Sequence, residues 1–393
     1  MTLARARSIA GRLGITRVTD ITRLDRVGVP VFAGIRPGAV RGSLCVSAGK
    51  GLRPIEAHVG AYMEAIEFAF AEFNRGGLDV FPVAAGDVYE GATRPESLLD
   101  FCPVLRTKVD LDALVACVEA IDIRTDRAYL VPAELVFHPM PPDLPNTPLL
   151  GTSTNGLSSG NTILEATIHG LCEVIERDVL SFMLADDRSR LVRDETLPSE
   201  MNPVREAVAA AGLELYVRAA DNVFGMPYFS ATVAEPGSRD PIYVSGGTGC
   251  HPSRRIALVR AVCEALQSRL SFIHGGRDDL TDRHAAFKGW GDVDRASYAS
   301  ALLAAVRRAE GAVSFQEVAD RERQITGLAP TLQMLLDVLA ERDFAHVLRV
   351  VYTSKTDPVQ AVRVIVPRLE FFTHATRRVG PRLQAFFEGL SGS

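Results

Sequence analysis

The sequence predicts an α+β fold, a mixed α/β architecture in which largely antiparallel sheets are combined with long helices. Strand-like apolar runs follow each other without a helix between them, as at 213–218 and 227–234, and such neighbours can pair antiparallel. Long stretches rich in alanine, leucine and glutamate predict helices elsewhere. The chain has 393 residues, 47 % of them hydrophobic and 23 % charged, which is the composition of a globular protein with a sizeable core.

The elements are assigned from apolar periodicity and from the positions of proline and glycine. Helices are expected at 54–73, with Pro54 in the first turn, and at 162–184, 252–274 and 331–342. Strands are expected at 29–34, 43–47, 213–218, 227–234, 346–353 and 361–367, with a strand pair at 127–137. Loops are expected at 77–103 (with short strands), 138–148, 151–161, the glycine-rich turn 246–249 and the polar stretch 275–299. No internal repeat or linker is evident, so residues 1–393 are expected to form a single unit.

Charge and cysteine content exclude several classes of function. The net charge of −5 disfavours a bulk nucleic-acid-binding protein, which would carry a basic domain. The six cysteines form no C-x-x-C pair, so neither a zinc site nor a disulfide framework is indicated. There is no secretory signal and no apolar run long enough for a membrane span. The protein is therefore expected in the cytoplasm, with neither membrane nor nucleic acid as a partner.

Acidic side chains gather on one face of two expected helices. Glu64 and Glu67 are three residues apart on the first helix, so they share a face. On the next, Glu176 lies about 20° and Glu173 about 80° around the axis from Glu165, so the three form one stripe. The positions between them are apolar, and an acidic stripe on an otherwise apolar helix calls for cations or buried donors.

A third helix carries Arg260, Glu264 and Gln267 at spacings of four and three, again on one face. Each group also has an ordinary explanation when it is taken alone. The glutamates fit a solvated face, Arg260 and Glu264 fit a surface salt bridge, and Asn161 or Thr162 fits a helix N-cap. Taken together, the carboxylates suit Mg²⁺, which takes its ligands from carboxylates and phosphates. Arginines would then hold phosphate oxygens, although no P-loop or kinase motif is present.

Three segments, taken in order, resemble the YcaO-domain family. They are SAGKGLRPIEAHVGAYMEAIE, TSTNGLSSGNTILEATIHGLCEVIERD and GTGCHPSRRIALVRAVCEALQSRL, and the resemblance extends over about residues 15–375. It implies the YcaO fold, with ATP and Mg²⁺ bound in a site that lacks a Walker motif. It also implies no separate peptide-docking domain in this chain.

The resemblance assigns roles to individual residues. Metal ligands would be Glu64, Glu67, Glu165, Glu173, Glu176 and Glu264. Nucleotide contacts would come from Lys50, Gly60, Glu64, Asn161, Arg177, Arg260, Glu264 and Gln267. Arg177 and Arg260 would also act in catalysis. Gly60 departs from the family pattern, because serine is usual there and its hydroxyl is missing. Lys50 is equally well explained as a solvated lysine. His169 is interpreted as a core residue, with a contact to Glu165 as the alternative.

The family resemblance further implies an ATP-dependent enzyme that phosphorylates a backbone amide of a ribosomally made precursor peptide. The chain ends in FFEGLSGS rather than in a proline-rich tail, which favours thioamide formation with a sulfide donor beside a TfuA-type partner. An azoline-forming cyclodehydratase with a separate leader-binding partner is the first alternative. An ATP-binding accessory factor in ribosomal protein methylthiolation is the second. A homodimer is the oligomer that the family suggests.

Overall fold

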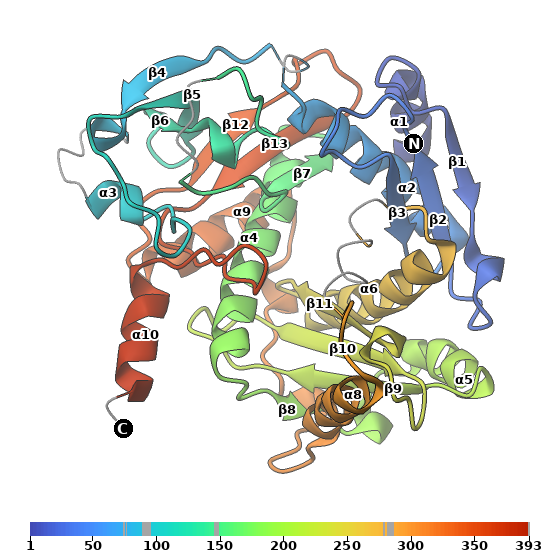
Figure 1. The fold of residues 1–393 in the computed structure, drawn as a ribbon. Coiled ribbons are helices and arrows are strands. Elements are labelled where there is room, and N and C mark those ends of the chain that lie inside the picture. The colour runs from blue at the N-terminus through green and yellow to red at the C-terminus, as the bar shows by residue number, and fades with distance from the viewer. Residues whose placement is uncertain are drawn as a thin grey trace.

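The computed structural model describes residues 1–73, 75, 77–88, 96–144, 149–277, 280 and 287–391. It contains three antiparallel sheets with helices packed on and between them (Figure 1). The predicted α+β class with long helices and antiparallel sheets is confirmed. Parts of the loops expected at 77–103, 138–148 and 275–299 lie outside the described residues.

The first sheet is a small antiparallel one near the N-terminus. Its order is β1-β2-β3, formed by Arg17–Asp20, Val31–Ile35 and Val46–Lys50. Two of these strands were predicted, but each lies two or three residues later in the chain than expected. The shift moves Lys50 out of the expected turn and makes it the last residue of β3, which fixes the direction of its side chain.

The largest sheet has the order β4-β5-β12-β13-β7, with β6 paired to β5. Its strands are Phe81–Ala84, Leu114–Asp122, Ala128–Pro132, Leu157–Gly160, Leu348–Val351 and Gln360–Ile365. The strand pair expected at 127–137 is wrong, because only β6 is a strand there and a 3-10 turn follows at Ala133–Leu135. The partner of β6 is β5, which the sequence analysis did not identify.

The third sheet has the order β11-β10-β9-β8 and consists of Val244–Cys250, Tyr228–Ala234, Glu214–Ala219 and Arg190–Leu191. The glycine-rich turn expected at 246–249 is wrong, since these residues lie inside strand β11. The glycines are needed there for packing, not for turning. A Cβ atom on Gly249 would lie 2.2 Å from the carbonyl oxygen of Ala257 in helix α6, so only glycine permits the close approach.

The helices are α1 to α6 and α8 to α10, formed by Thr2–Ala10, Pro54–Ala71, Glu96–Leu99, Ile163–Ala185, Asn202–Ala210, Arg254–His274, Asp292–Arg307, Leu328–Ala340 and Pro381–Ser391. Local signals fix their ends. Thr162 caps α4 by accepting from the Glu165 N–H, Ser253 caps α6, and Gly275 ends α6 with a φ of 65°. Helix α8 begins within the stretch expected to be irregular, so that expectation is wrong from Asp292 onward.

Three strand–helix units are built on the same register, although no repeat was recognised in the sequence. Gly49 of β3, Ser158 of β7 and Gly249 of β11 each lie against the carbonyl of an alanine eight residues later, at the start of α2, α4 and α6. A Cβ atom added to Gly49 would lie 2.0 Å from Ala57 O, and one added to Gly249 would lie 2.2 Å from Ala257 O. In the second unit, Ser158 Oγ donates a hydrogen bond of 2.8 Å to Ala166 O. These three helices surround the centre of the molecule in Figure 1.

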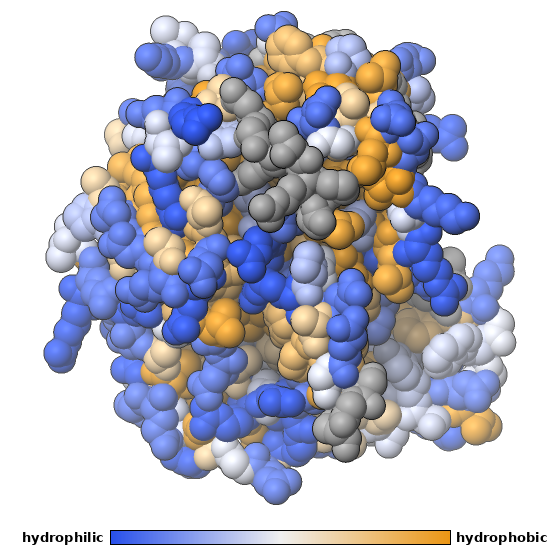
Figure 2. Space-filling model, turned by 90° about the vertical axis from the view of Figure 1, so that its left-hand side faces the viewer, coloured by the Kyte–Doolittle hydropathy of each residue, from blue (hydrophilic) through white to orange (hydrophobic). Residues whose placement is uncertain are grey.

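The cores form around these units. One buried cluster joins α1, α2 and the largest sheet, a second joins α5 and α6 to the third sheet, and a third joins α4 and α9 to β13. Most of the face that carries α3 and α10 is hydrophilic, with hydrophobic residues in separate patches (Figure 2). Within the described residues, no helix is both long and apolar enough to cross a membrane.

Candidate functional site

The three predicted acidic groups occupy equivalent positions in the three strand–helix units. Seven residues after the packing alanine shared by the units (Ala57, Ala166, Ala257) lie Glu64, Glu173 and Glu264, and ten residues after it lie Glu67, Glu176 and Gln267. The position three residues after the alanine is held by Gly60, His169 and Arg260. Because each strand fixes its helix by the same contact, the shared spacing places like side chains at the same height of the three helices.

Strand β3 links the first helix to the third. The backbone N–H of Ala48 donates to Glu64 Oε2 at 2.5 Å, and the carbonyl of Ala48 accepts from Gln267 Nε2 at 2.5 Å. Two residues on, Lys50 Nζ lies 2.7 Å from Glu264 Oε2. The structure therefore brings together Lys50, Glu64, Glu264 and Gln267. The first and the last of these are more than 200 positions apart in the sequence.

Strand β11 links the second helix to the third unit in a similar way. Glu176 accepts from Thr248 Oγ1 at 2.7 Å and from the Cys250 N–H at 3.0 Å, and its side chain is buried. Arg177 Nη1 lies 3.5 Å from Glu176 and donates to Thr248 Oγ1 at 3.4 Å. These contacts hold Arg177 toward the third helix, where the charge of Glu264 also acts on it.

Glu67 and Glu173 make the centre of the site strongly acidic. Glu67 accepts from Ser159 Oγ at 2.6 Å, whereas no hydrogen bond reaches the Glu173 carboxylate from the described residues. Burial, together with the charges of Glu173 and Glu64, raises the pKa of Glu67 to about 8 despite the Ser159 contact. Burial and Glu176 raise the pKa of Glu173 to about 7, against the opposing effect of Arg177. A cation placed here would relieve the repulsion.

Asn161 and Glu165 pair at the outer end of α4. The backbone N–H of Asn161 donates to Glu165 Oε2 at 3.0 Å, and Asn161 Nδ2 lies 3.2 and 3.1 Å from the two carboxylate oxygens. Thr162, and not Asn161, is the N-cap, which settles the alternative left open by the sequence. Glu165 is therefore held by its own helix start, and Glu64 by the strand of its own unit. Contacts between units hold Glu67, Glu176 and Glu264.

His169 orients Arg260, a contact that the sequence analysis did not anticipate. Arg260 Nη1 lies 3.0 Å from His169 Nε2. Burial and then the charge of Arg260 lower the pKa of His169 to about 3, so the ring is neutral and Nε2 accepts from the guanidinium. The signal that could have identified His169 is its position, which is equivalent to that of Arg260 in the next unit.

Gly60 occupies the same equivalent position in the first unit. A Cβ atom there would lie 3.3 Å from Gly49 Cα and 3.6 Å from Lys50 N, so helix α2 approaches strand β3 closely at this point. Any polar contact that serine would have supplied must come from another residue. Lys50, which follows Gly49 on the strand next to Gly60, is such a residue.

The residues fit a metal ion that is bound together with a phosphate group better than a metal ion held by protein side chains alone. Within the described residues, no three His, Cys, Asp or Glu side chains converge into a preformed metal site. Mg²⁺ does not need one, because it commonly takes one or two carboxylates, with phosphate oxygens and waters completing its shell. Buried polar atoms also lack partners at the site in the described part of the chain, namely Asn161 Oδ1, Arg260 Nε and Tyr228 Oη. Unpaired buried donors and acceptors beside an acidic cluster are what a polar ligand would satisfy.

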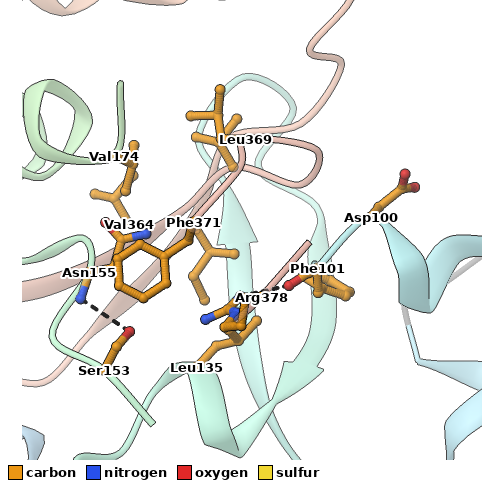
Figure 3. A pocket seen from close by; sticks show the side chains of 12 residues that line it. Asp100, Phe101, Leu135, Ser153, Asn155, Val174, Val364, Leu369, Phe371 and Arg378 are labelled. Atoms are coloured by element: carbon orange, nitrogen blue, oxygen red, sulfur yellow. Dashed lines mark hydrogen bonds between the residues drawn. The ribbon is translucent and has the colours of Figure 1, made fainter. Parts of the chain in front are cut away.

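A separate small cavity borders α4 at Val174 and is lined by Asn155, Arg378 and Phe371 (Figure 3). Its volume of about 40 Å³ holds a few waters at most and is too small for a nucleotide. Asn155 Oδ1 is buried there without a partner among the described residues, so a water is the natural occupant. This cavity is therefore not the nucleotide site.

Comparison with known proteins decides the family. A family model described as YcaO cyclodehydratase, binding ATP and Mg²⁺, matches residues 48–370. The chain belongs to the YcaO family. The sequence-based predictions of the family, its fold and its cofactors, ATP and Mg²⁺, are thereby confirmed. The match includes all the acidic groups on α2, α4 and α6.

Relatives of this YcaO protein span nearly its whole length. An uncharacterized protein of Methanothermobacter thermautotrophicus is 34 % identical over 95 % of this chain and 94 % of its own. A protein of Rhizobium leguminosarum bv. trifolii, described by its place in the tfuA 3′ region, is 30 % identical over 94 % of this chain and 87 % of its own. The structure of YcaO from Methanopyrus kandleri, bound with AMPPCP and Mg²⁺, is 25 % identical with a TM-score of 0.74, covering 97 % of this chain and 94 % of that one.

Proposed function

We propose that this YcaO protein uses Mg²⁺ and ATP to phosphorylate a backbone amide of a ribosomally made peptide, and that sulfide then replaces the amide oxygen to give a thioamide. The observation that carries the choice of product is the near full-length similarity to a relative encoded in a tfuA region. The acidic site on three helices, flanked by Arg177 and Arg260, supports the ATP-dependent step.

In the proposed site, the carboxylates hold the metal ion and the basic and amide side chains contact the nucleotide. Mg²⁺ would be held by carboxylates from the set Glu64, Glu67, Glu165, Glu173, Glu176 and Glu264, and it would neutralise the triphosphate charge. Arg177 and Arg260 would contact phosphate oxygens with their planar guanidinium groups. Lys50, Asn161 and Gln267, with the backbone at Gly60, would complete the nucleotide contacts.

The proposed reaction balances without a redox partner. Hydrosulfide adds to the amide carbon, and the carbonyl electron pair moves onto oxygen. That oxygen attacks the terminal phosphorus of ATP and forms an O–P bond as the bond to ADP breaks. The tetrahedral carbon then loses phosphate by cleavage of its C–O bond and loses the proton on sulfur. The products are a thioamide, ADP and phosphate, and the amide oxygen ends in the phosphate.

An azoline-forming cyclodehydratase is the second candidate, because the family model carries that description. In that case a Cys, Ser or Thr side chain of the peptide would replace sulfide as the nucleophile. In either case we propose that the chain acts in the cytoplasm as one catalytic unit, as a homodimer, with a TfuA-type or leader-binding protein as partner.

The product can be determined by incubating the protein with the peptide encoded beside its gene, ATP, Mg²⁺ and sulfide, with and without the neighbouring partner. A mass gain equal to the exchange of one oxygen for sulfur supports the thioamide. Loss of one water supports the azoline. Absence of ADP release with any peptide and partner contradicts both and favours an accessory role.

A peptide labelled with ¹⁸O at its backbone amides tests the activation step itself. The label is expected in the released phosphate, in an amount equal to the modified peptide. Label released into water, or label kept in the modified peptide, would contradict phosphorylation of the amide oxygen.

A further inference from the structure

Two cavities lie next to each other beside the candidate site. The first has a volume of about 710 Å³ and is lined by Arg5, Asn161, Ile163, Leu164, Lys355 and Pro358. The second has a volume of about 700 Å³ and is lined by Arg12, Leu13, Phe70, Phe73, Arg75 and Tyr352. Asp357 borders both, so the two cavities adjoin at this residue, and together they are called the groove. The groove lies between α1, the end of α2 and the turn from β12 to β13.

The groove carries excess positive charge. Among its described lining residues the acid is Asp357, which Arg12 binds at 2.6 Å and the Ser354 N–H at 2.8 Å. Arg75 is paired as well, because its Nε lies 3.4 Å from Glu72. Neither Arg5 nor Lys355 has a salt-bridge partner within the described part of the chain. In a protein with a net charge of −5, such a local excess of cations selects an acidic ligand.

The floor of the groove is apolar. Leu13, Phe70 and Tyr352 are buried beneath it, and Ile163 and Leu164 are partly exposed along it. An extended peptide presents alternate side chains to opposite faces, so it can rest apolar residues on such a floor while acidic ones reach the cations. The few cations and the apolar side chains of the floor favour a peptide over a nucleic acid, which needs a row of phosphate contacts.

The groove reaches the candidate site at Asn161. The Asn161 side chain holds Glu165, and Arg5 Nη1 lies 3.3 Å from the Asn161 carbonyl oxygen. We propose that the groove binds an acidic, extended segment of the peptide substrate and thereby places the adjoining segment at the site between α2, α4 and α6. Placement of the adjoining segment at the site rests on the proposed function, whereas binding of the acidic segment in the groove does not.

Binding can be measured by fluorescence anisotropy with a fluorescein-labelled synthetic peptide that alternates aspartate with leucine. The test variant is Lys355→Glu combined with Arg75→Gln, one change in each half of the groove. The matched control is Arg239→Glu combined with Arg342→Gln, two exposed arginines outside it. The groove variant is expected to weaken binding by roughly tenfold or more, because attractive charges are removed or reversed. The control variant should bind as the wild type does, and a peptide with lysine in place of aspartate should not bind.

Several outcomes would overturn the proposal. They are no binding of the aspartate peptide to the wild-type protein, unchanged binding by the groove variant, and equal loss in the control. Displacement of the peptide by RNA at equal charge concentration would also overturn it. Lys355→Glu alone, at an exposed side chain, repeats the test should the double variant be unstable. ATP binding, measured in parallel, separates the two proposals: its absence together with intact peptide binding removes the ATP-dependent function and leaves the groove.

Discussion

Lys50 Nζ and Glu264 Oε2 lie 2.7 Å apart and join the first strand–helix unit to the third. Burial alone would raise the pKa of Glu264, but the charges of Lys50 and Arg177 lower it to about 2. Glu264 is therefore a carboxylate that already has a cation beside it. Mg²⁺ can use it only by sharing it with Lys50 or by displacing the ammonium group.

Lys50→Met is expected to strengthen Mg²⁺ binding in the absence of nucleotide, because Glu264 loses its competing cation. The same change should weaken binding of Mg²⁺-ATP, since a positive charge near the phosphates is lost. Titration calorimetry with Mg²⁺ alone and then with ATP measures both, and Lys50→Arg is the control that keeps the charge. If Mg²⁺ affinity without nucleotide stays the same, Lys50 does not compete at the metal site.

The glycines of β11 provide a test of how the units are assembled. Gly249→Ala places a Cβ atom 2.2 Å from the Ala257 carbonyl oxygen, whereas the nearest atom to a Cβ on Gly246 is 3.9 Å away. Gly249→Ala should lower the free energy of unfolding by about 1–3 kcal/mol or more, and Gly246→Ala should leave it nearly unchanged. Chemical denaturation measures the difference. Equal stability of the two variants would show that α6 does not pack on β11 at this distance.

Stability without metal should depend on pH through Glu67 and Glu173. The folded-state pKa values of about 8 and about 7 lie above the ordinary value of 4.5. Proton binding therefore stabilises the fold fully below pH 4.5, and this contribution is lost as the pH rises through 7 and 8. Mg²⁺ should offset the loss, so the rise in melting temperature on adding Mg²⁺ should be larger at about pH 8.5 than at about pH 6.

The double variant Glu67→Gln/Glu173→Gln is the control for this pH dependence. Its amides carry no proton to lose, so the added effect of Mg²⁺ should be small and nearly independent of pH. A wild-type response to Mg²⁺ that does not change with pH would mean that these two glutamates are not charged or not near the ion.

Arg177→Lys tests whether the guanidinium group matters beyond its charge. Lysine keeps the charge but loses the planar donor pair, so the rate of ATP hydrolysis should fall by roughly 10²-fold or more, with a smaller effect on Mg²⁺-ATP binding. Arg188→Lys, at an exposed arginine after the end of the same helix, is the matched control. Similar rates for the two variants would remove Arg177 from the catalytic set.

Much of the fold was predictable because its signals are local. Pro54 marks the start of α2, and long apolar periods mark α4 and α6. The sequence-based predictions were wrong where contacts between distant segments decide the secondary structure. The glycines at 246–249 are typical of a turn in isolation, but they lie in a strand because helix α6 packs directly on it. Strand β5 has no flanking turn signal strong enough to stand out, and its pairing with β6 and β12 defines it.

The sequence predicts which side chains gather at the candidate site, but it does not predict their partners. The spacing of charged and polar residues pointed to the three helices. By contrast, Ala48 contacts Gln267, Ser159 contacts Glu67 and Thr248 contacts Glu176 from strands distant in sequence. Backbone atoms and hydroxyl groups of this kind leave no pattern that a single sequence reveals. The shared offset of eight residues between strand and alanine was present in the sequence, and only the packing shows why it matters.

Binding of Mg²⁺-ATP to three single variants, one from each helix, tests the central claim that the three helices form one site. The variants are Glu64→Gln, Glu176→Gln and Glu264→Gln, with Glu206→Gln on the exposed side of α5 as the control. Each of the three is expected to raise the Kd for Mg²⁺-ATP by roughly tenfold or more, while the control binds as the wild type does and all four remain folded. Unchanged affinity in any one of the three would remove its helix from the site and contradict the account.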